Sequence, residues 1–140
     1  GAASRDCYPN LKGDYDKLSA AGAAVGRLNR LLKEHVADEP IFYLLRDFLS
    51  LLDKHTAEVL WYQWLANMFL YKLLEHLGYG INFETYQAEN GPKLDKEMRI
   101  LLARARGLSI SDIGKLKVSR NLLERTNPFL EFWIQNTSEF

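Results

Sequence analysis

Apolar residues near the start of the chain recur every three or four positions, which is the spacing of one face of an α-helix. The pattern predicts a helix over about residues 14–34. Its expected buried face carries Tyr15, Leu18, Gly22, Val25, Leu28, Leu32 and Val36. A glycine inside a helix costs about 1 kcal/mol relative to alanine. We therefore expect Gly22 and Gly26 to serve close packing against a neighbouring backbone.

A second periodic stretch opens with residues that favour a helix start, because Asp38 can cap the helix and Pro40 suits its first turn. Its apolar stripe comprises Ile41, Leu44, Leu45, Phe48, Leu49 and Leu52. A third stretch, capped by Thr56, is apolar around most of its circumference over residues 59–77. Only a narrow polar line interrupts it, formed by Gln63, Asn67 and Glu75. Such a helix must lie at the centre of a domain.

Gly78 directly follows this central helix, at the position where a left-handed glycine commonly ends one. Further on, a fourth helix is predicted from Leu94, Met98, Leu101, Leu102 and Ala105, with Gly107 at its end. The sequence SISD at 109–112 resembles a capping box and predicts a short helix. Ser119 is expected to cap a last helix, which Pro128 should kink or restart at Asn127.

No stretch alternates apolar and polar residues over the length of a strand, and no internal repeat is visible. The predicted fold is therefore all-α, a compact bundle of about five or six helices around a central apolar helix at about residues 57–77. Residues 1–7 are expected to be disordered or a remnant of cloning. Residues 8–140 are expected to form a single helical domain.

Composition restricts the classes of function. The chain carries 18 Lys and Arg and 18 Asp and Glu, so no overall charge attracts it to nucleic acid or to anionic lipid. The longest apolar stretch contains several polar and charged residues, so no membrane span is predicted. Cys7 is the only cysteine and cannot form an internal disulfide. These features favour an intracellular, cytoplasmic protein.

Motifs for catalysis or for metal binding are absent from the sequence. There is no GxSxG, no HExxH and no phosphate-binding glycine loop. His35, His55 and His76 lie on three separate segments without a neighbouring cysteine, so a histidine metal site is not expected. The sequence thus predicts a protein that is not an enzyme and that needs no cofactor.

Two clusters of basic residues are the candidate binding surfaces. Arg27, Arg30 and Lys33 follow one another along the first helix. The fourth helix carries Lys96, Arg99, Arg104 and Arg106. Either cluster could bind phosphate groups or an acidic peptide, and either could equally be an ordinary solvated helix face.

Beyond these local patterns, the order of features resembles the helical C-terminal part of the bacterial recombination mediator RecO. A small-residue helix, an acidic break and a leucine-rich helix are followed by a central helix that ends in KLLEHLGYG, the most specific element. The segment LKVSRNLLERTNPFLEFWI is similar to the closing segment of that family. The likeness covers nearly all of residues 8–135. The N-terminal oligonucleotide-binding barrel of the family has no counterpart in these 140 residues.

The resemblance implies a role in DNA repair and recombination. RecO proteins bind single-stranded DNA, partner RecR, and engage the acidic, phenylalanine-ended tail of single-strand-binding protein through their helical part. Many of them hold zinc with four cysteines after the LGY turn, but TYQAENGPK has none here, so zinc is not expected. The first hypothesis is a non-catalytic module that binds these partner proteins and, weakly, single-stranded DNA. The alternative is a structural adaptor that docks another protein and binds no nucleic acid.

Overall fold

The computed structural model describes residues 8–33, 35–86 and 91–138, and these residues form seven helices and no strand. The predicted all-α fold is therefore confirmed. The prediction for residues 1–7 lies outside the described residues. The helices are α1 (Pro9–Lys12), α2 (Tyr15–Leu32), α3 (Glu39–Lys54), α4 (Val59–His76), α5 (Lys96–Arg106), α6 (Ile110–Ile113) and α7 (Arg120–Ser138).

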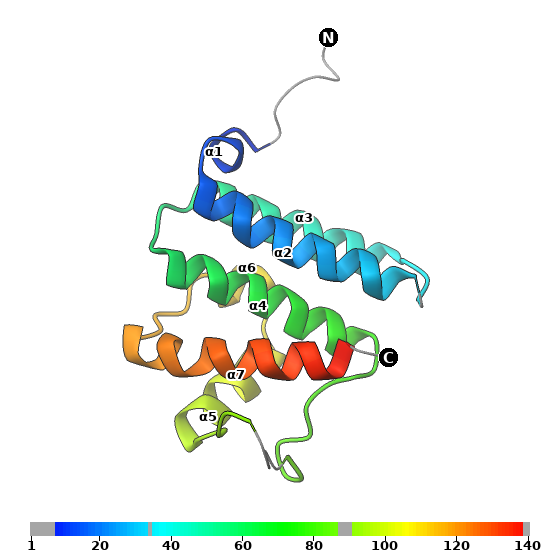
Figure 1. Ribbon diagram of the computed structural model, residues 1–140, viewed down its shortest axis with the longest axis vertical. Coiled ribbons are helices and arrows are strands. Elements are labelled where there is room, and N and C mark those ends of the chain that lie inside the picture. The colour runs from blue at the N-terminus through cyan, green and yellow to red at the C-terminus, as the bar shows by residue number, and fades with distance from the viewer. Residues whose placement is uncertain (1–7, 34, 87–90, 139–140) are drawn as a thin grey trace.

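Helix α4 occupies the middle of the bundle (Figure 1). The antiparallel pair α2 and α3 packs on one side of α4, and α7 packs on the other. The short α6 lies against α3 and α4, and α5 lies against α7. The prediction of a central apolar helix is confirmed, because eleven of the 18 residues of α4 are buried. An almost wholly apolar circumference is what a helix surrounded by other helices requires.

Helix α2 buries a different face from the one that its large apolar residues predict. The buried residues are Lys17, Ala20, Ala21, Ala24, Leu28 and Leu31. Of the expected stripe only Leu28 is buried, whereas Tyr15 is 82% exposed and Val36 is 90% exposed. The helix is rotated by about one residue because the alanine face fits against α4, which supplies the bulky side chains of this interface. The predicted stripe was therefore wrong.

A buried lysine completes that interface. The Lys17 ammonium donates a hydrogen bond to the backbone oxygen of Asp53 at 2.8 Å and lies 5.7 Å from the centre of the Tyr62 ring. The Asp53 carboxylate accepts a hydrogen bond from the backbone N–H of Leu11 at 2.9 Å. Buried polar groups are tolerated when they are paired in this way. These bonds fasten α1 and the start of α2 to the end of α3.

The glycines of α2 do not serve close packing. A Cβ atom built on Gly22 or Gly26 would meet nothing within 4 Å, so that prediction was wrong. The prediction for Gly78 is confirmed, because its φ is +96° and it follows the last residues of α4. Tyr79 N–H donates to the Leu74 oxygen at 2.8 Å and Gly78 N–H donates to the Glu75 oxygen at 3.1 Å. This pair of bonds is the Schellman motif.

Two helix boundaries differ from the prediction. Helix α4 begins after Glu58 and not at Thr56, because the Tyr62 hydroxyl accepts the N–H of Ala57 at 2.9 Å and closes the preceding turn. Helix α7 runs through Pro128 without restarting at Asn127. The Asn127 amide donates to the Leu60 oxygen at 3.1 Å and accepts from Asn67 at 3.0 Å. These bonds to α4 hold α7 in place where the proline removes a backbone donor.

Candidate interaction surfaces

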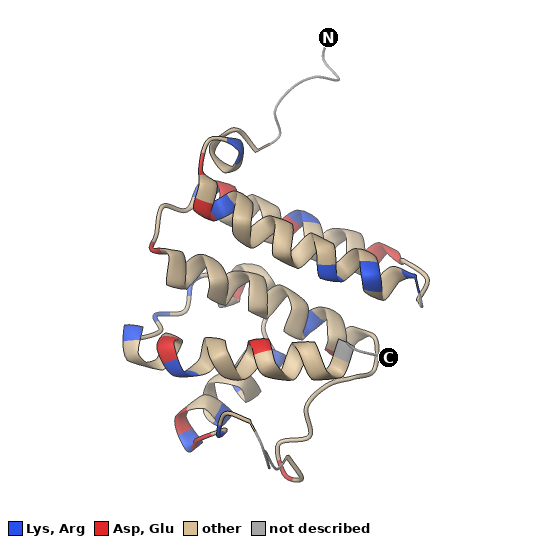
Figure 2. Cartoon of the chain, viewed as in Figure 1, with Lys and Arg blue, Asp and Glu red and all other residues tan. Residues whose placement is uncertain are grey.

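The two basic clusters lie on separate parts of the bundle (Figure 2). The first cluster lies in the C-terminal half of α2 and at its C-cap. Arg27 is half-buried, and Arg30 and Lys33 are exposed. The cluster on α5 lies on the far side of α4 and α7 from α2. The structure therefore offers two distinct cationic surfaces and does not join them into one site.

Two cations of the α5 cluster are engaged in holding the loop that follows Gly78. Arg106 pairs with Glu75 at 2.7 Å, donates to the backbone oxygen of Ile81 at 2.5 Å, and stacks over the Phe83 ring at 4.6 Å. Arg99 donates to the backbone oxygen of Phe83 at 3.0 Å. A guanidinium that hydrogen-bonds a backbone carbonyl and a carboxylate at once crosslinks the two segments that carry them. Arg106 and Arg99 thus fix the loop.

Lys72 reinforces the same junction from α4. Its ammonium donates to the backbone oxygens of Ala105 at 3.2 Å and Arg106 at 3.3 Å, which are terminal carbonyls of α5. Burial lowers the pKa of Lys72, and the nearby Glu75 carboxylate opposes that shift. Cations at a helix C-terminus satisfy carbonyls that have no partner within the helix.

The remaining cations of α5, Lys96 and Arg104, are exposed and have no ionic or hydrogen-bond partner among the described residues. They lie four residues before and four residues after Ile100, whose surface is 59% exposed. Residues at this spacing share one face of a helix. An apolar side chain between two cations is thus presented to solvent along α5.

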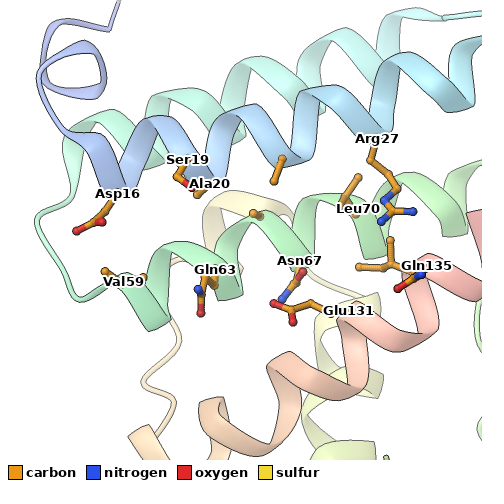
Figure 3. Close-up of a pocket in the computed structure, with 13 residues that line it drawn as sticks. Asp16, Ser19, Ala20, Arg27, Val59, Gln63, Asn67, Leu70, Glu131 and Gln135 are labelled. Atoms are coloured by element: carbon orange, nitrogen blue, oxygen red, sulfur yellow. The ribbon is translucent and has the colours of Figure 1, made fainter. Parts of the chain in front are cut away.

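A groove runs along α4 between α2 and α7 and encloses about 320 Å³ (Figure 3). We call it the α2–α4–α7 groove. Its apolar walls come from all three helices, in particular Ala20, Ala23, Ala66, Leu70 and Ile134. Its polar lining consists of Asp16, Ser19, Arg27, Gln63, Asn67, Glu131 and Gln135. Val59 closes the lining at the start of α4.

Arg27 is the one residue of the α2 cluster that lines this groove. It follows Ala23 and Ala20 on one stripe of α2, and its side chain descends toward Leu70 and Gln135 in Figure 3. Arg30 lies three residues further along α2, so it continues the same stripe beyond the groove. The groove therefore has a guanidinium beside an apolar floor, formed by Ala66, Leu70 and Ile134, and it has further cations just outside.

The groove itself was not predicted, although one signal for it was present in the sequence. Gln63 and Asn67 form the polar line on the otherwise apolar α4, and both line the groove. Asn67 is only 6% exposed, and its amide nitrogen donates to Asn127. A polar line on a central helix indicates where neighbouring helices part. Glu131 and Gln135 gave no comparable signal, because α7 is amphipathic and carries polar residues elsewhere.

The model of one protein family, described as "RecO_C: Recombination protein O C terminal", matches residues 12–85. This segment covers α2, α3, α4 and the first residues of the loop after Gly78, and it includes most of the groove. The chain belongs to the RecO C-terminal family. Comparison with curated proteins and with solved structures gives no match. Membership makes the chain a helical module related to recombination and repair.

Within residues 8–33, 35–86 and 91–138, no three His, Cys, Asp or Glu side chains are grouped as metal ligands would be. In the same part of the chain, no helix combines the length and the apolar character needed to cross a membrane. The expectations that the chain has no cofactor and no enzymatic activity remain predictions.

Proposed function

We propose that this chain is a non-catalytic recombination module whose α2–α4–α7 groove binds the acidic, phenylalanine-ended tail of single-strand-binding protein. The observation that carries the proposal is the apolar floor directly beside Arg27. A tail of this kind needs an apolar recess for its last side chain and a cation for its carboxylates. A module that works beside bacterial single-strand-binding protein would act in the cytoplasm.

The chemistry of the tail matches that of the groove. The aromatic ring would lie on Leu70 and Ile134, which are themselves largely buried. The terminal carboxylate would pair with Arg27, since guanidinium and carboxylate groups form strong two-point hydrogen bonds. Arg30 on the next turn of α2 and Lys33 at its C-cap are both exposed. They would attract the acidic residues that precede the phenylalanine.

A labelled peptide with this acidic tail tests the proposal by fluorescence anisotropy at low salt. We expect Arg27→Ala to weaken binding about tenfold or more, because a charge-assisted pair is lost. Arg46→Ala is the matched control, since Arg46 is an exposed arginine of α3 outside the groove. A wild-type chain that fails to bind the peptide, or an Arg27→Ala variant that binds as well as wild type, would contradict the proposal.

Weak binding of single-stranded DNA is proposed for the α5 surface formed by Lys96, Ile100 and Arg104. The two cations can contact phosphates, and the exposed Ile100 can contact a base. We expect affinity for an oligonucleotide to fall steeply with salt, and Lys96→Ala with Arg104→Ala to reduce both the affinity and the slope. Binding that is absent at low salt would instead favour the structural adaptor, which docks a protein and no nucleic acid.

A RecR-like protein is proposed as a second partner. Helix α3 exposes Phe42 at 61% and Tyr43 at 51%, and exposed aromatic side chains commonly mark protein contacts. We expect Phe42→Ser to weaken binding of purified RecR in calorimetry. Ile100→Ser is the matched control, because Ile100 on α5 is exposed to nearly the same extent, 59%. Equal losses in the two variants would refute a contact through α3.

A further inference from the structure

The α2–α4–α7 groove carries opposite charges toward its two ends. Arg27 and Asp16 line it from the same helix and are eleven residues apart, which corresponds to about 16 Å along α2. Glu131 contributes a second carboxylate from α7. It precedes Gln135 by one helical turn, and Figure 3 shows Gln135 below Arg27 and Glu131 beside Asn67. The cation is therefore confined to one end of the groove.

Among the described residues, neither Asp16 nor Glu131 takes part in an ion pair. Both residues are exposed at the groove wall. A groove carboxylate without a cationic partner repels the acidic side chains of a peptide that enters the groove.

We propose that Glu131, together with Asp16, limits how far an acidic peptide enters the groove and so sets its direction. The inference rests on the proposed function. Only the terminal phenylalanine and its carboxylate enter, at the Arg27 end. The preceding acidic residues stay outside, along Arg30 and Lys33. Glu131 is thus a specificity-determining residue that selects tails whose last residue is apolar and whose acidic residues come before it.

This arrangement predicts that loss of the Glu131 charge strengthens binding of the acidic tail. Charges within about one Debye length, roughly 10 Å at 0.1 M salt, interact appreciably. We expect Glu131→Gln to tighten binding of the acidic peptide about three- to tenfold at low salt, and less at high salt. Glu131→Asp keeps the charge and should bind like wild type.

The control variant and the control peptide isolate this effect. Glu84→Gln removes the same charge from an exposed loop residue that does not line the groove. It should leave the affinity unchanged, which excludes a general effect of net charge. A second peptide keeps the terminal phenylalanine and its carboxylate but has asparagine in place of the preceding acids. Glu131→Gln should tighten binding of this peptide less than binding of the acidic peptide, because only the terminal carboxylate remains to be repelled.

The outcomes separate the inference from the function on which it rests. If the wild-type chain binds the acidic peptide through Arg27 and Glu131→Gln has no effect on the affinity, the inference is overturned and the proposed function stands. If Glu131→Gln and Glu84→Gln tighten binding equally, the inference is also overturned. If neither wild type nor Glu131→Gln binds the peptide, the proposed function fails and the inference fails with it.

Discussion

Glycine has opposite consequences at different positions of this chain. Gly78 has a φ of +96°, in the left-handed region that side chains with a Cβ disfavour by about 1–2 kcal/mol. Gly22 lies in the middle of α2 with a negative φ and open space where a Cβ would be. Gly91 differs again, because an added Cβ would lie 2.5 Å from the Phe132 ring. Backbone conformation and surroundings decide what each glycine contributes.

Substitution by alanine at two of these positions should therefore change stability in opposite directions. Gly78→Ala should destabilise the protein by about 1 kcal/mol, because the left-handed cap of α4 becomes strained. Gly22→Ala should stabilise it by about 0.5–1 kcal/mol, because helix propensity rises and no clash opposes it. Urea unfolding followed by circular dichroism measures both. A loss of stability in Gly22→Ala would contradict the open space at this position.

At the scale of elements, two side-chain pairs join the connection between α2 and α3 to the end of α4. The Nε2 atom of His76 lies 2.9 Å from a carboxylate oxygen of Asp38. The Tyr79 hydroxyl lies 3.4 Å from the Nε2 atom of His35. Asp38 also caps α3, since its side chain accepts the N–H of Ile41 at 3.2 Å. One carboxylate thus begins α3 and fastens it to α4.

The Asp38 contact makes stability depend on pH. The hydrogen bond from His76 holds the pKa of Asp38 below its usual value, although desolvation opposes the shift. A lowered folded-state pKa gives stability that is present above the unfolded value near 3.9 and is lost as pH falls through the folded value. Asp38→Asn keeps a capping side chain but removes the charge. Its melting temperature should therefore lie below wild type at pH 6.

The same variant should approach wild type as the carboxylate of Asp38 becomes protonated. Melting curves recorded from pH 6 to pH 2 follow this convergence. Asp47→Asn is the control, because among the described residues Asp47 pairs with the exposed Arg46 of the same helix alone. A gap between Asp38→Asn and wild type that stays constant down to pH 2 would mean that the charge is not the cause.

At the scale of the whole molecule, α4 connects every layer of the bundle. Its Phe69 ring stacks on Phe48 of α3, with ring centres 4.9 Å apart, and both rings are fully buried. The Tyr71 hydroxyl donates to the Leu102 oxygen of α5 at 2.8 Å. Burial raises the pKa of Tyr71 to about 12, so this donor keeps its proton. Because α2, α3 and α7 all rest on α4, we expect them to unfold together.

Phe69→Ala should lower the free energy of unfolding by about 3–5 kcal/mol, because it removes a fully buried ring and leaves a cavity. Transitions followed by tryptophan fluorescence and by circular dichroism should still coincide. Phe42→Ala, on the exposed side of α3, should cost much less. Two separate transitions would show that the α2 and α3 pair unfolds independently of α4.

Local chemistry in the sequence was enough to place most helix ends. Ser109 and Ser119 cap their helices as expected, by accepting the N–H groups of Asp112 and Leu122. Contacts that are distant in the sequence decided the exceptions. The Tyr62 hydroxyl binds the N–H of Ala57, in the turn where Thr56 was expected to begin the helix. The hydrogen bonds of Asn127 to α4 stabilise α7 next to Pro128, and the helix continues past the proline. Capping is readable because it joins residues within one turn.

For the basic surfaces too, the sequence predicts which residues are present, and contacts distant in the sequence decide their environment. The sequence identified the seven cations of the two clusters. Only the structure shows that Arg99 and Arg106 bind the loop after Gly78, whereas Lys96 and Arg104 have no partner among the described residues. A cation's environment depends on which loop folds over it. The apolar floor beside Arg27 likewise arises from three helices, so no single segment contains it.

The sequence by itself determined that this chain is all-α, that residues 59–77 form its centre, and that Gly78 ends that helix. These properties depend on periodicity and on local backbone conformation, which neighbouring residues control. Only the tertiary structure decided that α2 turns its alanines inward and leaves Tyr15 and Leu18 exposed. The physical reason is that packing depends on the fit between two surfaces, and the bulky face of α4 accepts small side chains better than large ones.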